Sequence, residues 1–131
     1  MNNQFNNPII YFFAKSNDLY FEKLEKAKYF LEAYKINNNE IYYDIYERNS
    51  LKYKNKLNKI LLSNSNVDLC ILSINDLGRD LTDLTNIMKL CYEKNIRIFD
   101  FQTNDFLDIN LHLFNYKELE MLVRDKQEQT L

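Results

Sequence analysis

The feature that most constrains the fold is a regular alternation of short apolar runs with longer segments of helical periodicity. The runs occupy residues 8–15, 40–47, 67–74 and 96–101 and are rich in β-branched and aromatic residues. Such runs are typical of strands buried on both faces. After each run, apolar residues recur three and four positions apart, as on one face of a helix. The resulting βαβαβαβα order predicts an α/β fold: a mostly parallel sheet of four to five strands with helices on both faces, followed by a C-terminal helix.

Helix starts are predicted from polar residues that can cap the first turn. Asn17 or Asp18 precedes the first helical stripe, and Asp80 precedes the third, with Asp83 three positions later. The last helix is expected over residues 108–126. In a parallel sheet, ligands bind beyond the carboxyl ends of the strands. We therefore expect the functional residues to lie in the loops after the first and third strands.

Composition indicates one globular domain over residues 1–131. Apolar residues make up 46% of the chain, which excludes a disordered protein, and the net charge is only −2. This balance argues against a surface that binds nucleic acid over its whole extent, although a local basic patch is compatible with it. We see no helix-turn-helix segment for reading DNA sequence after the last predicted helix.

The cysteines and the single histidine do not predict a metal site. Cys70 and Cys91 both lie in apolar patterns without metal-ligand or redox spacing, so we interpret them as buried free thiols of a reducing compartment. His112 is the only histidine, and it is more simply interpreted as a surface or packing residue of the last predicted helix. No apolar run reaches the length of a membrane span, and the N-terminus lacks signal-peptide features. A cytoplasmic protein is expected.

Two short stretches carry a resemblance to a known family. FFAKS (Phe12–Ser16) ends the first predicted strand, and INDLGRD (Ile74–Asp80) links the third strand to the next helix and contains Gly78, the only glycine of the chain. Over residues 8–101 the sequence resembles the catalytic domain of resolvase/invertase serine recombinases. The LGRD segment in its strand-to-helix context is the specific part. We expect glycine at this position because a side chain would crowd the turn and approaching DNA.

The resemblance implies a site for cleaving and rejoining DNA strands. Ser16 matches the nucleophile that attacks a DNA phosphodiester, and Arg79 matches an arginine that binds the scissile phosphate. Lys52 or Lys54 falls near a further phosphate-binding arginine of the family. The family reaction needs no metal and no cofactor. The remaining family arginines are absent: Ala14 and Asp76 stand in their places.

These departures predict impaired chemistry. Loss of one preorganised donor to developing charge costs about 2.7–4 kcal/mol, and a carboxylate beside the phosphate would add repulsion. Two hypotheses follow: a serine recombinase domain of reduced activity, or a catalytically inactive resolvase-like domain that serves dimerisation or partner binding. The expected partners are DNA, bound weakly or through another domain, and a second copy of the chain, contacted through the C-terminal helix. No membrane contact is expected.

Overall fold

The computed structural model describes residues 5–36, 41–46, 55–78 and 80–109, and these residues form a five-stranded sheet of order β2-β1-β3-β4-β5. Strands β1 to β4 are parallel, and β5 pairs with β4 in the antiparallel direction. The elements in chain order are β1 (Pro8–Ala14), α1 (Asn17–Ala33), β2 (Ile41–Ile45), α2 (Asn55–Ser63), β3 (Asp68–Ile71), the 3-10 turn η1 (Ile74–Asp76), α3 (Leu81–Glu93), β4 (Arg97–Asp100) and β5 (Asp105–Phe106).

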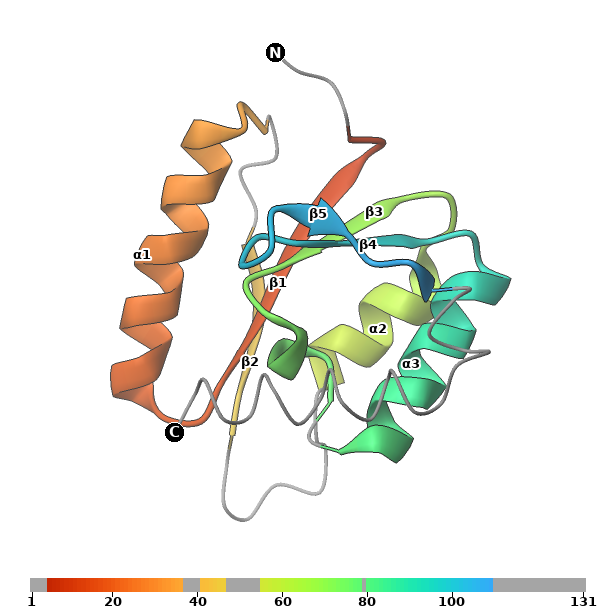
Figure 1. Ribbon diagram of the computed structural model, residues 1–131. Helices are drawn as coiled ribbons and strands as arrows, with labels where there is room; N and C mark the ends of the chain where they lie inside the picture. Colours follow the sequence, from red (N-terminus) through yellow and green to blue (C-terminus); the bar gives the residue numbers. More distant parts are fainter. Residues whose placement is uncertain (1–4, 37–40, 47–54, 79, 110–131) are drawn as a thin grey trace.

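Helices cover both faces of the sheet. Helix α1 lies along one face, and α2 and α3 cover the other (Figure 1). Strand β1 lies between β2 and β3, and all its residues from Ile10 to Ala14 are buried. Alternate side chains of β1 therefore enter two separate cores, which explains why its sequence is apolar throughout rather than alternating.

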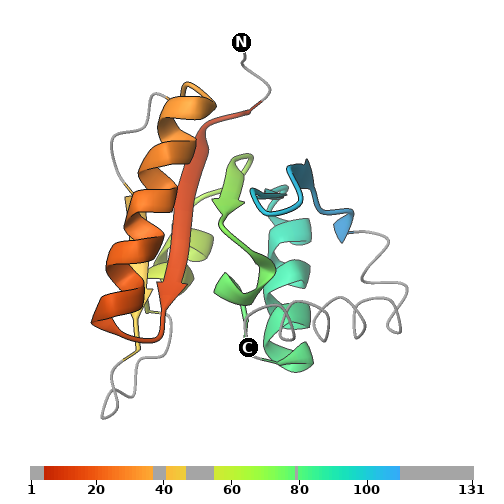
Figure 2. The ribbon, with the colours of Figure 1, turned by 60° about the vertical axis from the view of Figure 1, so that its left-hand side comes forward.

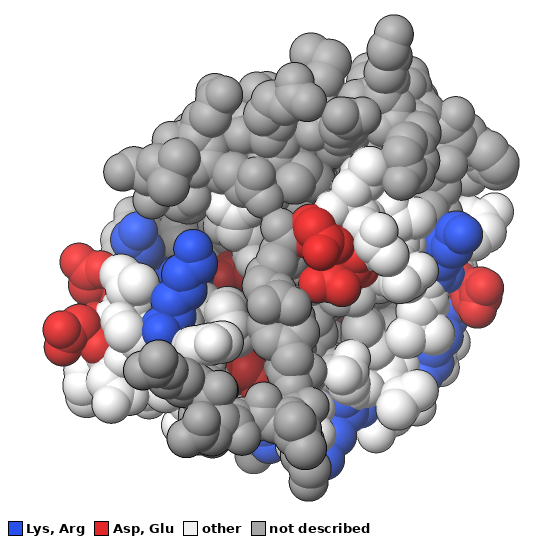
Figure 3. All heavy atoms as spheres, turned by 90° about the horizontal axis from the view of Figure 1, so that it is seen from below, with Lys and Arg blue, Asp and Glu red and all other residues white. Residues whose placement is uncertain are grey.

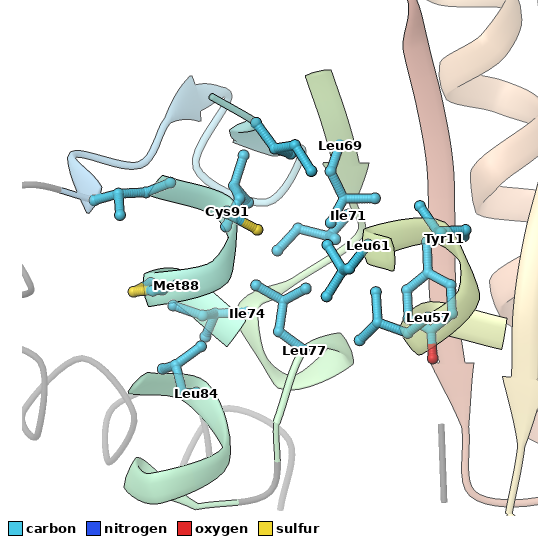
Figure 4. Packing of buried hydrophobic residues seen from close by; sticks show 14 of the residues in the cluster. Tyr11, Leu57, Leu61, Leu69, Ile71, Ile74, Leu77, Leu84, Met88 and Cys91 are labelled. Atoms are coloured by element: carbon cyan, nitrogen blue, oxygen red, sulfur yellow. The ribbon is translucent and has the colours of Figure 1, made fainter. Parts of the chain in front are cut away.

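The core beneath α2 and α3 is the larger of the two. Tyr11 and Phe13 of β1 enter it, together with side chains from β3, β4, η1 and both helices (Figure 4). Its fully buried members include Leu57, Leu61, Leu69, Ile71, Leu77 and Met88. On the opposite face, Phe12 packs with α1 residues such as Ala27, and Phe30 stacks on Phe101 with ring centroids 4.2 Å apart.

The predicted α/β architecture is confirmed, with corrections at the ends of elements. The third strand ends at Ile71 and not at Ile74, because the N–H groups of Leu72 and Ser73 donate to the carboxylate of Asp76 instead of continuing the ladder. The two-residue strand β5 is too short to give a periodic signal in the sequence. The predicted C-terminal helix lies outside the described residues except for its first positions.

Both cysteines are free and buried, as predicted. Burial raises the pKa of the Cys70 thiol well above its usual range and that of Cys91 to about 12, so neither thiolate forms near neutral pH. We expect both thiols to react with Ellman's reagent at neutral pH only as fast as the chain unfolds. The same assay in urea should release two equivalents at once; rapid reaction of either thiol in the native protein would contradict this.

No helix in the described part of the chain is both long enough and apolar enough to span a membrane.

Candidate active site

The candidate site lies at the edge of the sheet where β1 and β3 end. These strands are parallel neighbours, with Tyr11 in register with Ile71, so the segments that follow them leave the sheet at the same edge. A tight turn joins the end of β1 to the start of α1 (Figure 2), and it contains Ser16. The segment after β3 contains η1 and Gly78. The sheet thus brings together the two stretches that the sequence singled out.

Ser16 caps the N-terminus of α1. Its Oγ accepts a hydrogen bond from the N–H of Leu19 at 3.2 Å, and its backbone is extended. The cap is therefore Ser16 rather than Asn17 or Asp18, because the chain turns into the helix one residue earlier than predicted. Ser16 is exposed, and a hydroxyl that accepts one hydrogen bond still has its own proton to donate. The N-terminus of a helix of 17 residues also favours negative charge beside this hydroxyl.

Asp76 is buried and accepts hydrogen bonds from three backbone amides. Oδ1 accepts from the N–H of Phe13 at 3.0 Å, and Oδ2 accepts from the N–H groups of Leu72 and Ser73, each at 3.0 Å. The side chain has no exposed surface. The expectation that this carboxylate faces a bound phosphate is wrong, because the amides at the ends of β1 and β3 hold it inside the fold.

Lys23 of α1 neutralises the Asp76 carboxylate. Its Nζ lies 2.8 Å from Asp76 Oδ1 and also donates to the carbonyl of Phe13 at 2.5 Å. Sequence reasoning missed both roles. The usable signal was Ser73 followed three residues later by Asp76, a capping-box pattern that the structure forms in η1. The lysine was not predictable, because it is 53 residues away in sequence.

Gly78 is buried where the chain passes the first turn of α3. Its φ is not positive, so backbone freedom does not explain it. A Cβ here would lie 2.8 Å from the nitrogen of Leu84 and 2.9 Å from the Cβ of Asp83. The glycine is required by close packing on α3, which agrees with the predicted crowding of the turn. The expectation that a side chain at position 78 would also crowd approaching DNA stays a prediction. Asp80 caps α3 as predicted, accepting from the N–H of Asp83 at 2.9 Å.

We expect Gly78→Ala to lower the free energy of unfolding by about 1–3 kcal/mol, because the added methyl group must displace backbone atoms of α3. Urea denaturation measures this change. The exposed Thr82 of the same helix turn provides the control, since Thr82→Ala should stay within about 0.5 kcal/mol of the parent. Equal stability of the two variants would contradict the packing explanation.

The other predicted site residues cannot be placed. Arg79, Lys52 and Lys54 lie outside the described residues. Lys56 and Lys59, the two lysines of α2, are described, and both are exposed. Among the described residues, no three His, Cys, Asp or Glu side chains come together as metal ligands.

A groove of about 990 Å³ lies next to this edge, between α1 and the loops that follow β3 and β4. Its walls include Phe13, Leu19 and Phe30. Its polar lining comes from Lys15, Glu22, Lys23, Glu25, Lys26, Ser73, Asn75 and Gln102. Figure 3 views the molecule from the side toward which β1 points and shows Lys and Arg alternating with Asp and Glu across the described surface. The described part of this face therefore has mixed charge.

Comparison with known proteins supports the fold. No family model matches the sequence, and no curated protein matches it. The structure is similar to the crystal structure of a resolvase family site-specific recombinase from Streptococcus pneumoniae, with a TM-score of 0.61 and 12% sequence identity. The match covers 95% of this chain and 89% of that chain.

This chain has a resolvase-like fold. The fold expected from FFAKS and INDLGRD is therefore confirmed. At 12% identity the likeness concerns the fold alone. The roles of Ser16, Arg79, Lys52 and Lys54 stay predictions.

Proposed function

We propose that this chain is the catalytic-type domain of a site-specific DNA recombinase, with Ser16 as the nucleophile. The observation that carries the proposal is the position of Ser16: an exposed hydroxyl at the N-terminus of α1, at the carboxyl edge of a resolvase-like sheet. A solved protein of this fold is a site-specific recombinase. Lys15, exposed beside the serine, adds a positive charge suited to a phosphodiester.

The reaction would conserve bond energy. Ser16 Oγ attacks the phosphorus, and the bond from phosphorus to the 3′ oxygen breaks. The hydroxyl proton of the serine leaves to a base, the 3′ oxygen gains a proton, and the 5′ phosphate stays covalently attached to the serine. Attack by a 3′ hydroxyl on this phosphoserine link reverses the step and reseals the strand. Arg79 would bind the non-bridging oxygens, with Lys52 or Lys54 as a further cation.

A second candidate is a resolvase-like domain without catalytic activity that binds a partner or a second copy of itself. The observation that favours it is Asp76, which occupies a position where the family pattern has an arginine. Its side chain is buried, accepts hydrogen bonds from backbone amides and forms an ion pair with Lys23. Position 76 therefore contributes no cation to a phosphate. Static light scattering would test the self-association that this candidate requires.

The two candidates differ in one product, a covalent link between Ser16 and DNA. The full chain with an affinity tag can be purified from its cells under denaturing conditions, digested with nuclease and protease, and analysed by mass spectrometry. Recombinase function predicts a nucleotide remnant on the peptide that contains Ser16. A remnant on another residue would overturn the assignment of the nucleophile. Its absence from well-expressed protein would favour the non-catalytic candidate. This capture needs no knowledge of the DNA target.

A further inference from the structure

The Asp76 carboxylate joins three parts of the molecule that surround the candidate site. It accepts hydrogen bonds from Phe13 at the end of β1 and from Leu72 and Ser73 after β3, and it forms an ion pair with Lys23 of α1. We propose that Asp76 is a positioning residue that, together with Lys23, fixes the Ser16 hydroxyl relative to the loop around Gly78. This inference rests on the proposed function only for its consequence in DNA cleavage.

Ser16 is held from both directions along the chain. Phe13, three residues before the serine, donates its N–H to Asp76 Oδ1 and accepts from Lys23 Nζ through its carbonyl. Lys23 itself lies in the helix that Ser16 caps. The same carboxylate forms the capping box of η1, which leads directly to Gly78. One buried group therefore sets the distance between the nucleophile turn and the glycine loop.

The burial of these groups makes the arrangement specific. Asp76 has no exposed surface, and a buried carboxylate is stable only while its donors are in place. The donors come from three segments, the end of β1, the segment after β3 and helix α1, so moving any one of these segments breaks a charged hydrogen bond. Catalytic groups need this kind of support, because a displacement of about 1 Å can reduce a rate by about 100-fold.

A matched control residue lies at the opposite end of β3. Asp68 is also buried, forms an ion pair with Arg97 at 2.7 Å, and accepts from the backbone N–H of Asn6 at 2.6 Å. Like Asp76, it is buried, has a cationic partner and accepts from a backbone amide, but it lies where β3 begins. Asp68→Asn therefore reproduces the general loss of a buried ion pair without touching the edge that contains Ser16.

The first measurement is independent of DNA. The N–H of Leu19 donates to Ser16 Oγ, so its exchange with solvent, followed by NMR in the full chain, reports whether the serine keeps its place. We expect Asp76→Asn to speed this exchange about fivefold, the change that follows loss of an N-cap hydrogen bond, and Asp68→Asn to leave it unchanged. Equal effects of the two variants, or no effect of either, would overturn the positioning role.

The second measurement applies the same variants to the covalent DNA adduct. If the parent chain forms the adduct, Asp76→Asn should lower its yield about 100-fold while retention on DNA-cellulose is unchanged, and Asp68→Asn should keep the parental yield. A normal yield in Asp76→Asn would overturn the inference. If the parent forms no adduct, the proposed function fails, and the exchange of the Leu19 amide alone decides the role of Asp76.

Substitutions of Lys23 keep the test usable if Asp76→Asn does not fold. Lys23 is partly exposed, with 27% of its side-chain surface accessible, so its replacement is milder. Lys23→Met removes the cation and should speed exchange of the Leu19 amide proton. Lys23→Arg keeps the cation and should retain the parental exchange rate. Equal exchange rates in these two variants would contradict the role given to the ion pair.

Discussion

Replacement of Ser16 by alanine or by asparagine is expected to abolish the covalent DNA adduct, but only alanine should also reduce stability. Neither side chain can attack phosphorus, so both remove the nucleophile. Asparagine is as good an N-cap as serine, whereas alanine at an N-cap costs about 0.5–2 kcal/mol. Adduct yield and urea denaturation, measured on both variants, separate the chemical role of the hydroxyl from its role in capping α1.

The asparagine variant is the informative one. Loss of the adduct in Ser16→Asn at parental stability would identify the hydroxyl as the reacting group. Retention of the adduct in that variant would rule out Ser16 as the nucleophile. Loss in Ser16→Ala together with retention in Ser16→Asn would mean that only the helix cap matters.

Leu61→Ala should cost far more stability than Leu62→Ala, although the two residues are adjacent in α2. Leu61 has no exposed surface and packs in the core between the sheet and the helices (Figure 4), whereas Leu62 is 72% exposed. Truncation of a buried leucine costs about 2–5 kcal/mol through lost burial and the cavity that remains. An exposed site usually changes by less than about 0.5 kcal/mol.

This pair is a close internal control, because residue type, substitution and helix are identical. Urea denaturation with a common slope for both variants gives the difference directly. Similar losses in the two variants would mean that α2 does not pack on the sheet as described. A change in slope for Leu61→Ala would indicate an altered unfolded state rather than a simple loss of packing.

Local patterns in the sequence determined the order of the elements and the general location of the site. The apolar run of residues 8–15 identified β1 as a strand buried on both faces, because such a strand is apolar along its length instead of alternating with polar residues. Asp80 was recognisable as a cap from its place before a helical stripe. Ser16 and Gly78 could be assigned to one edge from the rule that parallel strands end together.

Element ends were less predictable where a distant group decides them. Strand β3 stops at Ile71 because the next two backbone N–H groups donate to the Asp76 carboxylate. The apolar pattern of Val67–Ile74 does not indicate where this happens. The cap of α1 is Ser16 because the chain turns there. Asn17 and Asp18 are equally good caps in sequence terms.

The sequence by itself determined the α/β architecture, the buried strands and the two stretches that meet at the carboxyl edge, because hydrophobic periodicity and capping are properties of neighbouring residues. Only the tertiary structure decided the state of the charges at that edge. From the sequence we expected Asp76 to be an acid exposed to phosphate, yet it is buried and paired with Lys23, 53 residues away in the chain. The physical reason is that the energy of a charge depends on its burial and its donors, and both are set by residues brought together in folding.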